Sequence, residues 1–190
     1  MAEVLLFHHA QGVTDGVAAF ADDLRAAGHT VHVPDLFDGA TFATLDAGMA
    51  HVQAEGFDAI TDRAMRLADD LPAELVYLGM SLGVVPAQRL AQTRPGARGA
   101  VLLYACLPTE YVGLWPEGLA AQVHGMDRDP IFVGEGDLEA ARALAADHPT
   151  VEVFTYPGDQ HYFADSSLPS YDAAATATLM ERVLAFLADR

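Results

Sequence analysis

The chain has 190 residues, with 10 Lys and Arg against 27 Asp and Glu, which gives a formal net charge of −17. Hydrophobic residues make up 52% and charged residues 19%, a composition that excludes a disordered chain and predicts one domain spanning residues 1–190. The acidic balance argues against a nucleic acid partner, whose phosphates need facing cations, and against docking on an anionic membrane.

The cysteine content and the start of the sequence narrow the expected location. A single cysteine, Cys106, excludes an internal disulfide and a cysteine-based zinc site. The first residues, MAEVLLFHHAQG, lack the basic segment of a signal peptide, and no apolar run reaches the ~20 residues of a membrane span. We therefore expect a cytoplasmic protein.

Short aliphatic runs alternate along the chain with segments of helical periodicity. Strands are predicted at residues 4–8, 30–34, 75–79, 99–104, 121–126 and 151–156. Helices are predicted at residues 15–27, 57–71, 83–93, 137–147 and 173–188. Residues 35–55 give mixed signals, and residues 107–118 are rich in Pro and Gly and indicate a loop.

This alternation predicts an α/β fold built on a mostly parallel sheet of six strands, with helices on both faces. The runs VLLF, LVYL and VLLY do not alternate in polarity, which is typical of strands buried on both faces. We expect the strand order 2-1-3-4-5-6, a small or open site and no large lid. Ligands of such sheets bind at the carboxyl ends of the strands, so the loops there should carry the function.

The sequence GMSLG at residues 79–83 has the pattern G-x-S-x-G and lies between a predicted strand and a predicted helix. This is the context of a nucleophile elbow, in which a sharp turn exposes a serine at the edge of the sheet. Gly79 and Gly83 would let the strand and the helix approach closely around Ser81. The alternative interpretation is a Gly-rich turn in which the serine only caps a helix.

A nucleophilic serine needs a histidine base, which in this fold follows it in the sequence. Three histidines come after Ser81. His124 lies inside a predicted strand, where a core role is more typical, and His148 lies at a helix end. His161 follows the last predicted strand, within PGDQHYFADSS, and is the best placed base.

The acid that orients the base should follow the strand at residues 121–126. Asp137 falls in the first turn of a helix, where an acidic residue is ordinary. Asp129 precedes Pro130 and lies far enough beyond the strand to reach the base, so we favour it. Asp127 is the second choice.

The loop after the first strand, His8-His9-Ala10-Gln11-Gly12, should lie beside the elbow. Its backbone N–H groups can supply half of an oxyanion hole, most simply from Ala10, and the N–H of Leu82 supplies the other half. Neighbouring residues on a strand point to opposite faces, which disfavours a shared metal ion between His8 and His9.

Four stretches together resemble the dienelactone hydrolase family of α/β-hydrolases: AAGHTVHVPDLFDG, the GMSLG elbow, HGMDRDPIF and YPGDQHYFADSS before the closing helix. The resemblance covers nearly the whole chain. It implies an α/β-hydrolase fold with Ser81 as nucleophile, Asp129 as acid and His161 as base. It also implies that the oxyanion is held by the N–H groups of Ala10 and Leu82.

The chain departs from that family at three positions. The name-giving enzymes use a cysteine where this chain has Ser81, a glutamate in the first loop where it has His9, and an arginine after the base where it has Asp165. An acidic residue at that last position makes an anionic lactone an unsuitable substrate. We therefore expect neutral or cationic esters.

The predicted function is a serine hydrolase that cleaves a small ester or lactone and needs no cofactor and no metal. His9, Gln11 and Tyr162 are expected to contact the substrate. Trp115, Tyr111 and Phe163 are further candidates for pocket aromatics, and core packing or a subunit contact is an equal alternative for Trp115. The alternatives are an inactive binding or regulatory module on a hydrolase scaffold, and an acyltransferase or perhydrolase with the same residues. The sequence does not distinguish a monomer from a dimer.

Overall fold

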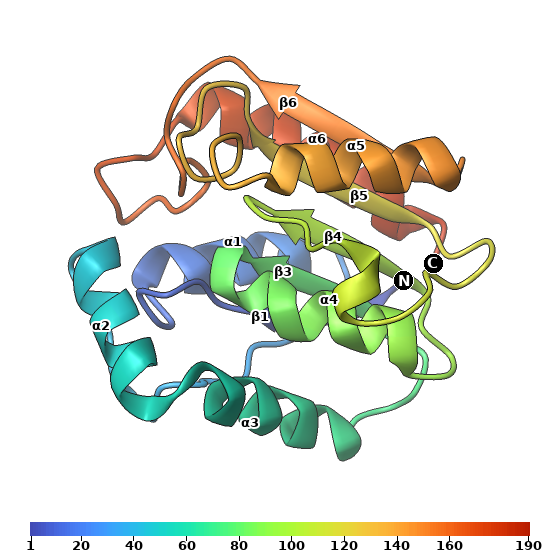
Figure 1. Cartoon of the computed structure of the whole chain (residues 1–190), viewed down its shortest axis with the longest axis horizontal. Helices are drawn as coiled ribbons and strands as arrows, with labels where there is room; N and C mark the ends of the chain where they lie inside the picture. The colour runs from blue at the N-terminus through green and yellow to red at the C-terminus, as the bar shows by residue number, and fades with distance from the viewer.

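A computed structural model of residues 1–190 shows one sheet of six strands in the order β2-β1-β3-β4-β5-β6 (Figure 1). Every neighbouring pair is parallel. The strands are β1 (Glu3–Phe7), β2 (Thr30–His32), β3 (Val76–Met80), β4 (Gly99–Leu103), β5 (Ala121–Met126) and β6 (Val151–Tyr156). The predicted fold class and strand order are confirmed.

Six α-helices cover the two faces of the sheet. They are α1 (Asp15–Ala26), α2 (Leu45–Glu55), α3 (Phe57–Asp69), α4 (Val84–Thr93), α5 (Asp137–Asp147) and α6 (Ala173–Ala188), with short 3-10 helices η1 (Ser81–Gly83) and η2 (Thr109–Tyr111). The helices α3, α4 and α5 pack on one face, and α1 and α6 pack on the other. None of them is both long enough and apolar enough to cross a membrane.

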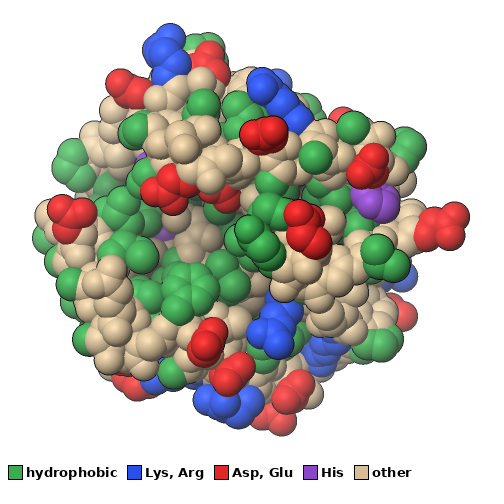
Figure 2. Space-filling model, viewed as in Figure 1, with side chains coloured by type: hydrophobic (Ala, Val, Ile, Leu, Met, Phe, Trp, Pro, Cys, Tyr) green, Lys and Arg blue, Asp and Glu red, His purple; other side chains and the backbone are tan.

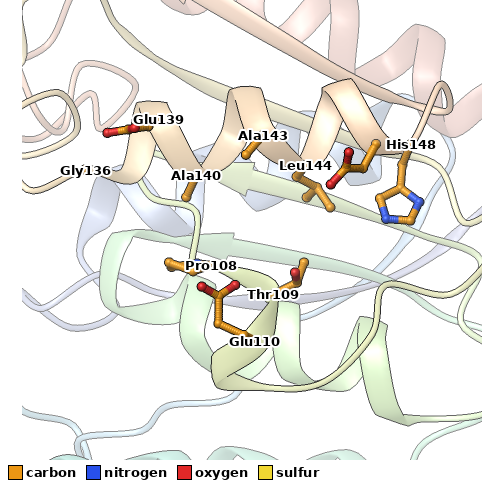
Figure 3. Close-up of a pocket in the computed structure, with 10 residues that line it drawn as sticks. Pro108, Thr109, Glu110, Gly136, Glu139, Ala140, Ala143, Leu144 and His148 are labelled. Atoms are coloured by element: carbon orange, nitrogen blue, oxygen red, sulfur yellow. The ribbon is translucent and has the colours of Figure 1, made fainter.

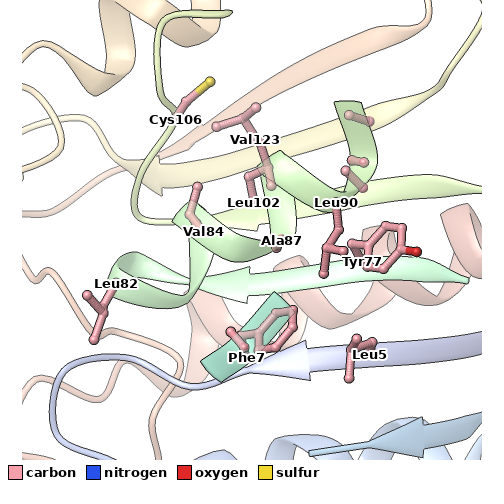
Figure 4. Close-up of a cluster of buried hydrophobic side chains, with 14 of the residues drawn as sticks. Leu5, Phe7, Tyr77, Leu82, Val84, Ala87, Leu90, Leu102, Cys106 and Val123 are labelled. Carbon is pink, nitrogen blue, oxygen red and sulfur yellow. The ribbon is translucent and has the colours of Figure 1, made fainter. Parts of the chain in front are cut away.

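The two hydrophobic cores follow from the alternation of side chains along each strand. Leu5 and Phe7 of β1 face the helices α3–α5, whereas Val4 and Leu6 face α1 and α6. Figure 4 shows the first of these cores, in which side chains from β1, β3, β4 and β5 gather against α4. Because both faces are covered, the central strands carry uninterrupted apolar runs.

The helix α2 is the one α-helix that the sequence did not predict. It lies within residues 35–55, where the signals were mixed, and of its eleven residues only Gly48 and Val52 are buried. Periodicity is therefore weak, because an apolar stripe is the main sign of a helix in a sequence. Thr44 caps the helix by accepting a hydrogen bond from the Ala47 N–H.

All parallel strands end at the same edge of the sheet, and the loops after β1, β3, β5 and β6 meet there. Figure 2 shows a hollow in this part of the surface, between α2 and the connection from β6 to α6. Hydrophobic side chains lie at the sides and below the hollow, acidic side chains lie along its upper rim, and histidine is visible in its depth. This is the region that the sequence indicated for the site.

Candidate active site

Ser81 lies on a sharp turn between β3 and α4, and its φ of 49° is in the left-handed region. L-residues adopt this conformation rarely, because the side chain crowds the backbone, and such strain is concentrated at functional sites. The two flanking glycines make the turn possible. A Cβ at Gly79 would lie 2.4 Å from the Gly83 oxygen, and one at Gly83 would lie 2.3 Å from the Phe7 oxygen. The predicted elbow geometry is present.

His161 and Asp129 form a hydrogen-bonded chain with this serine. The Ser81 Oγ lies 2.9 Å from His161 Nε2, and His161 Nδ1 lies 2.6 Å from Asp129 Oδ2. Asp129 is fully buried, and its Oδ1 accepts a hydrogen bond from the Ile131 N–H. A buried carboxylate that accepts from Nδ1 leaves Nε2 free to accept the hydroxyl proton of Ser81.

The other candidate acids and histidines lie outside this chain. Asp127 is exposed, and its Oδ1 accepts a hydrogen bond from the Gly158 N–H. Asp137 accepts one from the Cys106 N–H in the first turn of α5. His124 is buried in β5, bonded to the Tyr156 hydroxyl, and His148 ends α5. The structure therefore brings together the three residues that the sequence favoured.

The loop after β1 holds Ala10 beside the site. A turn is closed by a hydrogen bond from the Gly12 N–H to the His9 oxygen. The helix α2 packs directly on this turn, since a Cβ at Gly48 would lie 2.0 Å from the Ala10 oxygen. Gln11 fixes the loop by donating to the Phe42 oxygen and accepting from the Phe42 N–H through its own carbonyl.

The side chains of Gln11 and His9 were predicted to contact a substrate, but in the structure their polar groups are bonded within the protein. Gln11 is buried and its side-chain amide is used to hold the loop. His9 is fully buried, its Nδ1 accepts from the Gln11 N–H, and its Nε2 donates to Asp165 at 2.8 Å. Because both ring nitrogens are engaged, His9 acts on the position of the loop instead.

Asp165 also needs a correction, because it does not face the site as a free charge. It is buried and accepts hydrogen bonds from His9, Thr14 and Ser167. Burial alone would raise the pKa of Asp165, but the hydrogen bonds from His9, Ser167 and Thr14 outweigh burial and lower it to about 2. A carboxylate enclosed in this way gives no direct reason for a substrate to be neutral or cationic.

Two tyrosines surround the base and were not assigned these contacts from the sequence. The Tyr162 ring stacks on His9, with centroids 4.3 Å apart, and is also packed against His161. Tyr104, at the end of β4, accepts a hydrogen bond from the Ala164 N–H and so supports the segment after the base. The sequence signal available for Tyr104 was only its place at the end of a predicted buried strand, and its φ of 72° is known from the structure alone.

The remaining aromatic candidates do not line the site. Trp115 is buried and its indole N–H donates to the Leu119 oxygen, so it is a core residue. Tyr111 is exposed on η2, and Phe163 is buried between α6 and the sheet. Their aromatic character alone did not distinguish a pocket from a core or surface position.

A separate cavity of about 330 Å³ lies between η2 and α5 (Figure 3). Its lining is about equally polar and apolar and includes Glu110, Glu139 and His148. None of the residues of the Ser81 chain lines it. No group of three or more His, Cys, Asp or Glu side chains is arranged to hold a metal ion.

The sheet order, the strained serine turn and the loops at the carboxyl edge define an α/β-hydrolase fold. The solved structures agree. A dienelactone hydrolase-like promiscuous phosphotriesterase, P91 from metagenomic libraries, superimposes with a TM-score of 0.75 at 18% identity, over 100% of this chain and 86% of its own. A proposed dienelactone hydrolase from Klebsiella pneumoniae gives the same score and identity, over 100% and 88% of the two chains.

The model of the dienelactone hydrolase family matches residues 1–190, so the chain belongs to this family. A thioesterase domain from the curacin biosynthetic pathway is more distant, with a TM-score of 0.65 at 15% identity over 96% of this chain and 90% of that domain. No curated protein sequence matches the chain. The resemblance noted in the sequence is thereby confirmed.

Proposed function

We propose that the protein is a carboxylic ester hydrolase that cleaves a small ester or lactone through an acyl-enzyme on Ser81. The observation that carries the proposal is the continuous hydrogen-bonded chain from Ser81 Oγ through His161 to the buried Asp129. The left-handed turn at the serine supports it further, because that strain exposes the hydroxyl at the edge of the sheet. Membership of a hydrolase family points the same way.

In the first half of the reaction, His161 Nε2 takes the proton of Ser81 as Oγ bonds to the carbonyl carbon. The electron pair of the carbonyl moves to its oxygen, which the N–H groups of Ala10 and Leu82 stabilise. When the tetrahedral intermediate collapses, His161 gives the proton to the departing alkoxide. Asp129 keeps the imidazole oriented and stabilises its protonated form.

In the second half, water replaces the alcohol. His161 takes a proton from the water while the water oxygen bonds to the acyl carbon. The new oxyanion is held by the same N–H groups of Ala10 and Leu82. Collapse then breaks the bond to Oγ, and the proton returns from His161 to Ser81. The products are the free acid and the starting enzyme, so the proposed cycle consumes only ester and water.

The test compares hydrolysis of a short aryl ester by the wild type, Ser81→Ala and His161→Ala. We expect both variants to lose several orders of magnitude in kcat, leaving only residual activity. A serine-directed phosphonate should label the wild type at Ser81 and leave Ser81→Ala unlabelled. Equal hydrolysis in all three proteins would reject the proposal.

The same experiment distinguishes the alternatives. A binding or regulatory module would neither turn over the ester nor react with the phosphonate. An acyltransferase or perhydrolase would retain labelling at Ser81 but pass the acyl group to an added alcohol or peroxide. Product analysis with and without that acceptor separates transfer from hydrolysis.

A further inference from the structure

The hydroxyl of Tyr162 is an unusual feature of the site. The side chain is buried, and its oxygen has no hydrogen-bond partner of normal geometry. Buried polar groups are nearly always paired, so an unpaired one calls for an explanation. A partner that arrives during the reaction would account for it.

The surroundings of this hydroxyl indicate what that partner is. The Ser81 side chain and the Ala10 N–H are near enough to act on this hydroxyl, but neither forms a hydrogen bond of normal geometry with it. The Ala10 N–H itself donates no backbone hydrogen bond. The Tyr162 hydroxyl and the Ala10 N–H therefore lie together beside Ser81, and neither has a hydrogen-bond partner of normal geometry. Because Ala10 is the expected oxyanion donor, we expect the oxygen of an attacked carbonyl to lie near both groups.

The hydroxyl is a donor at neutral pH. Burial raises the pKa of Tyr162 to about 12, against the opposing effect of the Ser81 hydroxyl and the Ala10 N–H. A tyrosine that remains protonated can donate its O–H to a developing negative charge.

The ring of Tyr162 is fixed in place from several sides. It stacks on His9 with an interplanar angle of 14°, and the ring of Tyr104 lies 5.8 Å away. His9 is held in turn by Asp165 and by the Gln11 N–H. A donor held this firmly needs little reorganisation when charge develops, which is the condition for effective stabilisation.

We propose that the Tyr162 hydroxyl is a third donor to the oxyanion, beside the N–H groups of Ala10 and Leu82. The proposal rests on the function proposed above. As the bond from Ser81 Oγ to the carbonyl carbon forms and the proton passes to His161, the carbonyl oxygen gains the electron pair. The Tyr162 O–H then donates to that oxygen and obtains the partner that it lacks in the free protein.

The test is Tyr162→Phe, which removes one oxygen and keeps the ring that stacks on His9. We expect kcat to fall about 10²-fold, as for the loss of one oxyanion donor, with little change in KM. Inhibition by a trifluoromethyl ketone, which forms a charged tetrahedral adduct with a nucleophilic serine, should weaken by a similar factor. Loss of an unpaired hydroxyl should not lower the urea midpoint of unfolding.

Tyr77→Phe is the matched control, because Tyr77 is equally buried and its hydroxyl contacts only Arg94, away from the site. It should retain the wild-type kcat. In a structure of the wild-type ketone adduct, the Tyr162 oxygen should lie 2.7–3.1 Å from the adduct oxygen, roughly the range of an oxyanion donor.

Wild-type or faster turnover by Tyr162→Phe would overturn the inference, since the hydroxyl would then be idle or block the site. If Ser81→Ala still abolishes activity in that case, the proposed hydrolase function survives and only the role of Tyr162 is rejected. If Ser81→Ala leaves hydrolysis unchanged, both proposals are rejected together. An adduct whose oxygen contacts only the backbone N–H groups would also reject the role of Tyr162.

Discussion

The Nε2 atom of His9 lies 2.8 Å from Oδ2 of Asp165, although the two residues are 156 positions apart in the sequence. Both are buried, one after β1 and the other after the base. These are two of the positions at which the chain departs from the pattern of the family that it resembles. Their contact shows that the two departures form one feature, an internal hydrogen-bonded pair beside the site.

The pair should contribute to stability as a unit, which a double-mutant cycle measures. His9→Phe keeps a ring to stack on Tyr162 but removes both nitrogens, and Asp165→Asn removes the charge. We expect each to lower the free energy of unfolding by about 2–4 kcal/mol, since hydrogen bonds to a buried charge are broken. The double variant should lose about 1–2 kcal/mol less than the sum. Urea unfolding supplies these values, and strictly additive losses would contradict the pairing.

Asp129 should be required for catalysis and Asp127 should not. In Asp129→Asn, the amide oxygen would keep the hydrogen bond from the Ile131 N–H, so the NH2 group would face His161 Nδ1 and leave the ring proton on Nε2. Nε2 could then not accept the Ser81 proton, so we expect kcat for an aryl ester to fall by about 10³–10⁴-fold. Asp127→Asn is the matched control, two residues away and exposed, and should change kcat less than about threefold. A larger loss for Asp127→Asn than for Asp129→Asn would reverse the assignment of the acid.

The sequence predicted the framework well because its signals are local. The last two strands and the last two helices have the predicted bounds, since each combines a clear period with a cap or a turn. The helix α2 was not predicted because it packs on a loop through Gly48 and not on the sheet through an apolar stripe. That contact depends on the tertiary structure and leaves little trace in the local pattern.

Some residues of the candidate site could likewise be predicted from local sequence signals, and others could not. The spacing around Ser81, the Pro after Asp129 and the loop position of His161 were enough to select residues that the structure brings into contact. The interpretation of His9 and Asp165 was wrong, because a lone His and a lone Asp on distant loops were taken as facing the substrate. Only the fold shows that they pair with each other and are closed to solvent.

Gly48→Ala should lower the free energy of unfolding, although replacing Gly by Ala in a helix usually raises it. In a helix, Ala is favoured over Gly by about 1 kcal/mol, so propensity alone predicts a more stable protein. Here the added Cβ would lie 2.0 Å from the Ala10 oxygen, and the backbone must move. We expect a loss of about 1–3 kcal/mol in unfolding free energy and a lower kcat, because the displaced turn carries the Ala10 N–H.

The neighbouring substitution Ala47→Gly is the control for Gly48→Ala. Ala47 is exposed on the same helix, so its replacement should cost about 1 kcal/mol of stability through helix propensity and leave kcat unchanged. Urea unfolding and ester hydrolysis of both variants provide the comparison. A Gly48→Ala protein that is more stable than the wild type and fully active would show that α2 does not support the loop.

Buried histidines should make the protein less stable below pH 6.5. Burial lowers the pKa of His124 from its ordinary value of 6.5 to about 3. The unfolded chain therefore binds a proton at a pH where the folded protein does not, and stability falls as the pH drops from about 6.5 toward 3. Between pH 7 and pH 5, this one histidine should lower the free energy of unfolding by about 2 kcal/mol.

His124→Gln removes the titrating group and should reduce the difference between the unfolding free energies at pH 7 and pH 5 by that amount. The half-exposed His148, replaced by Gln, is the control for loss of a histidine outside the core. An unaltered pH dependence in His124→Gln would contradict the prediction, whatever the absolute stability of the variant.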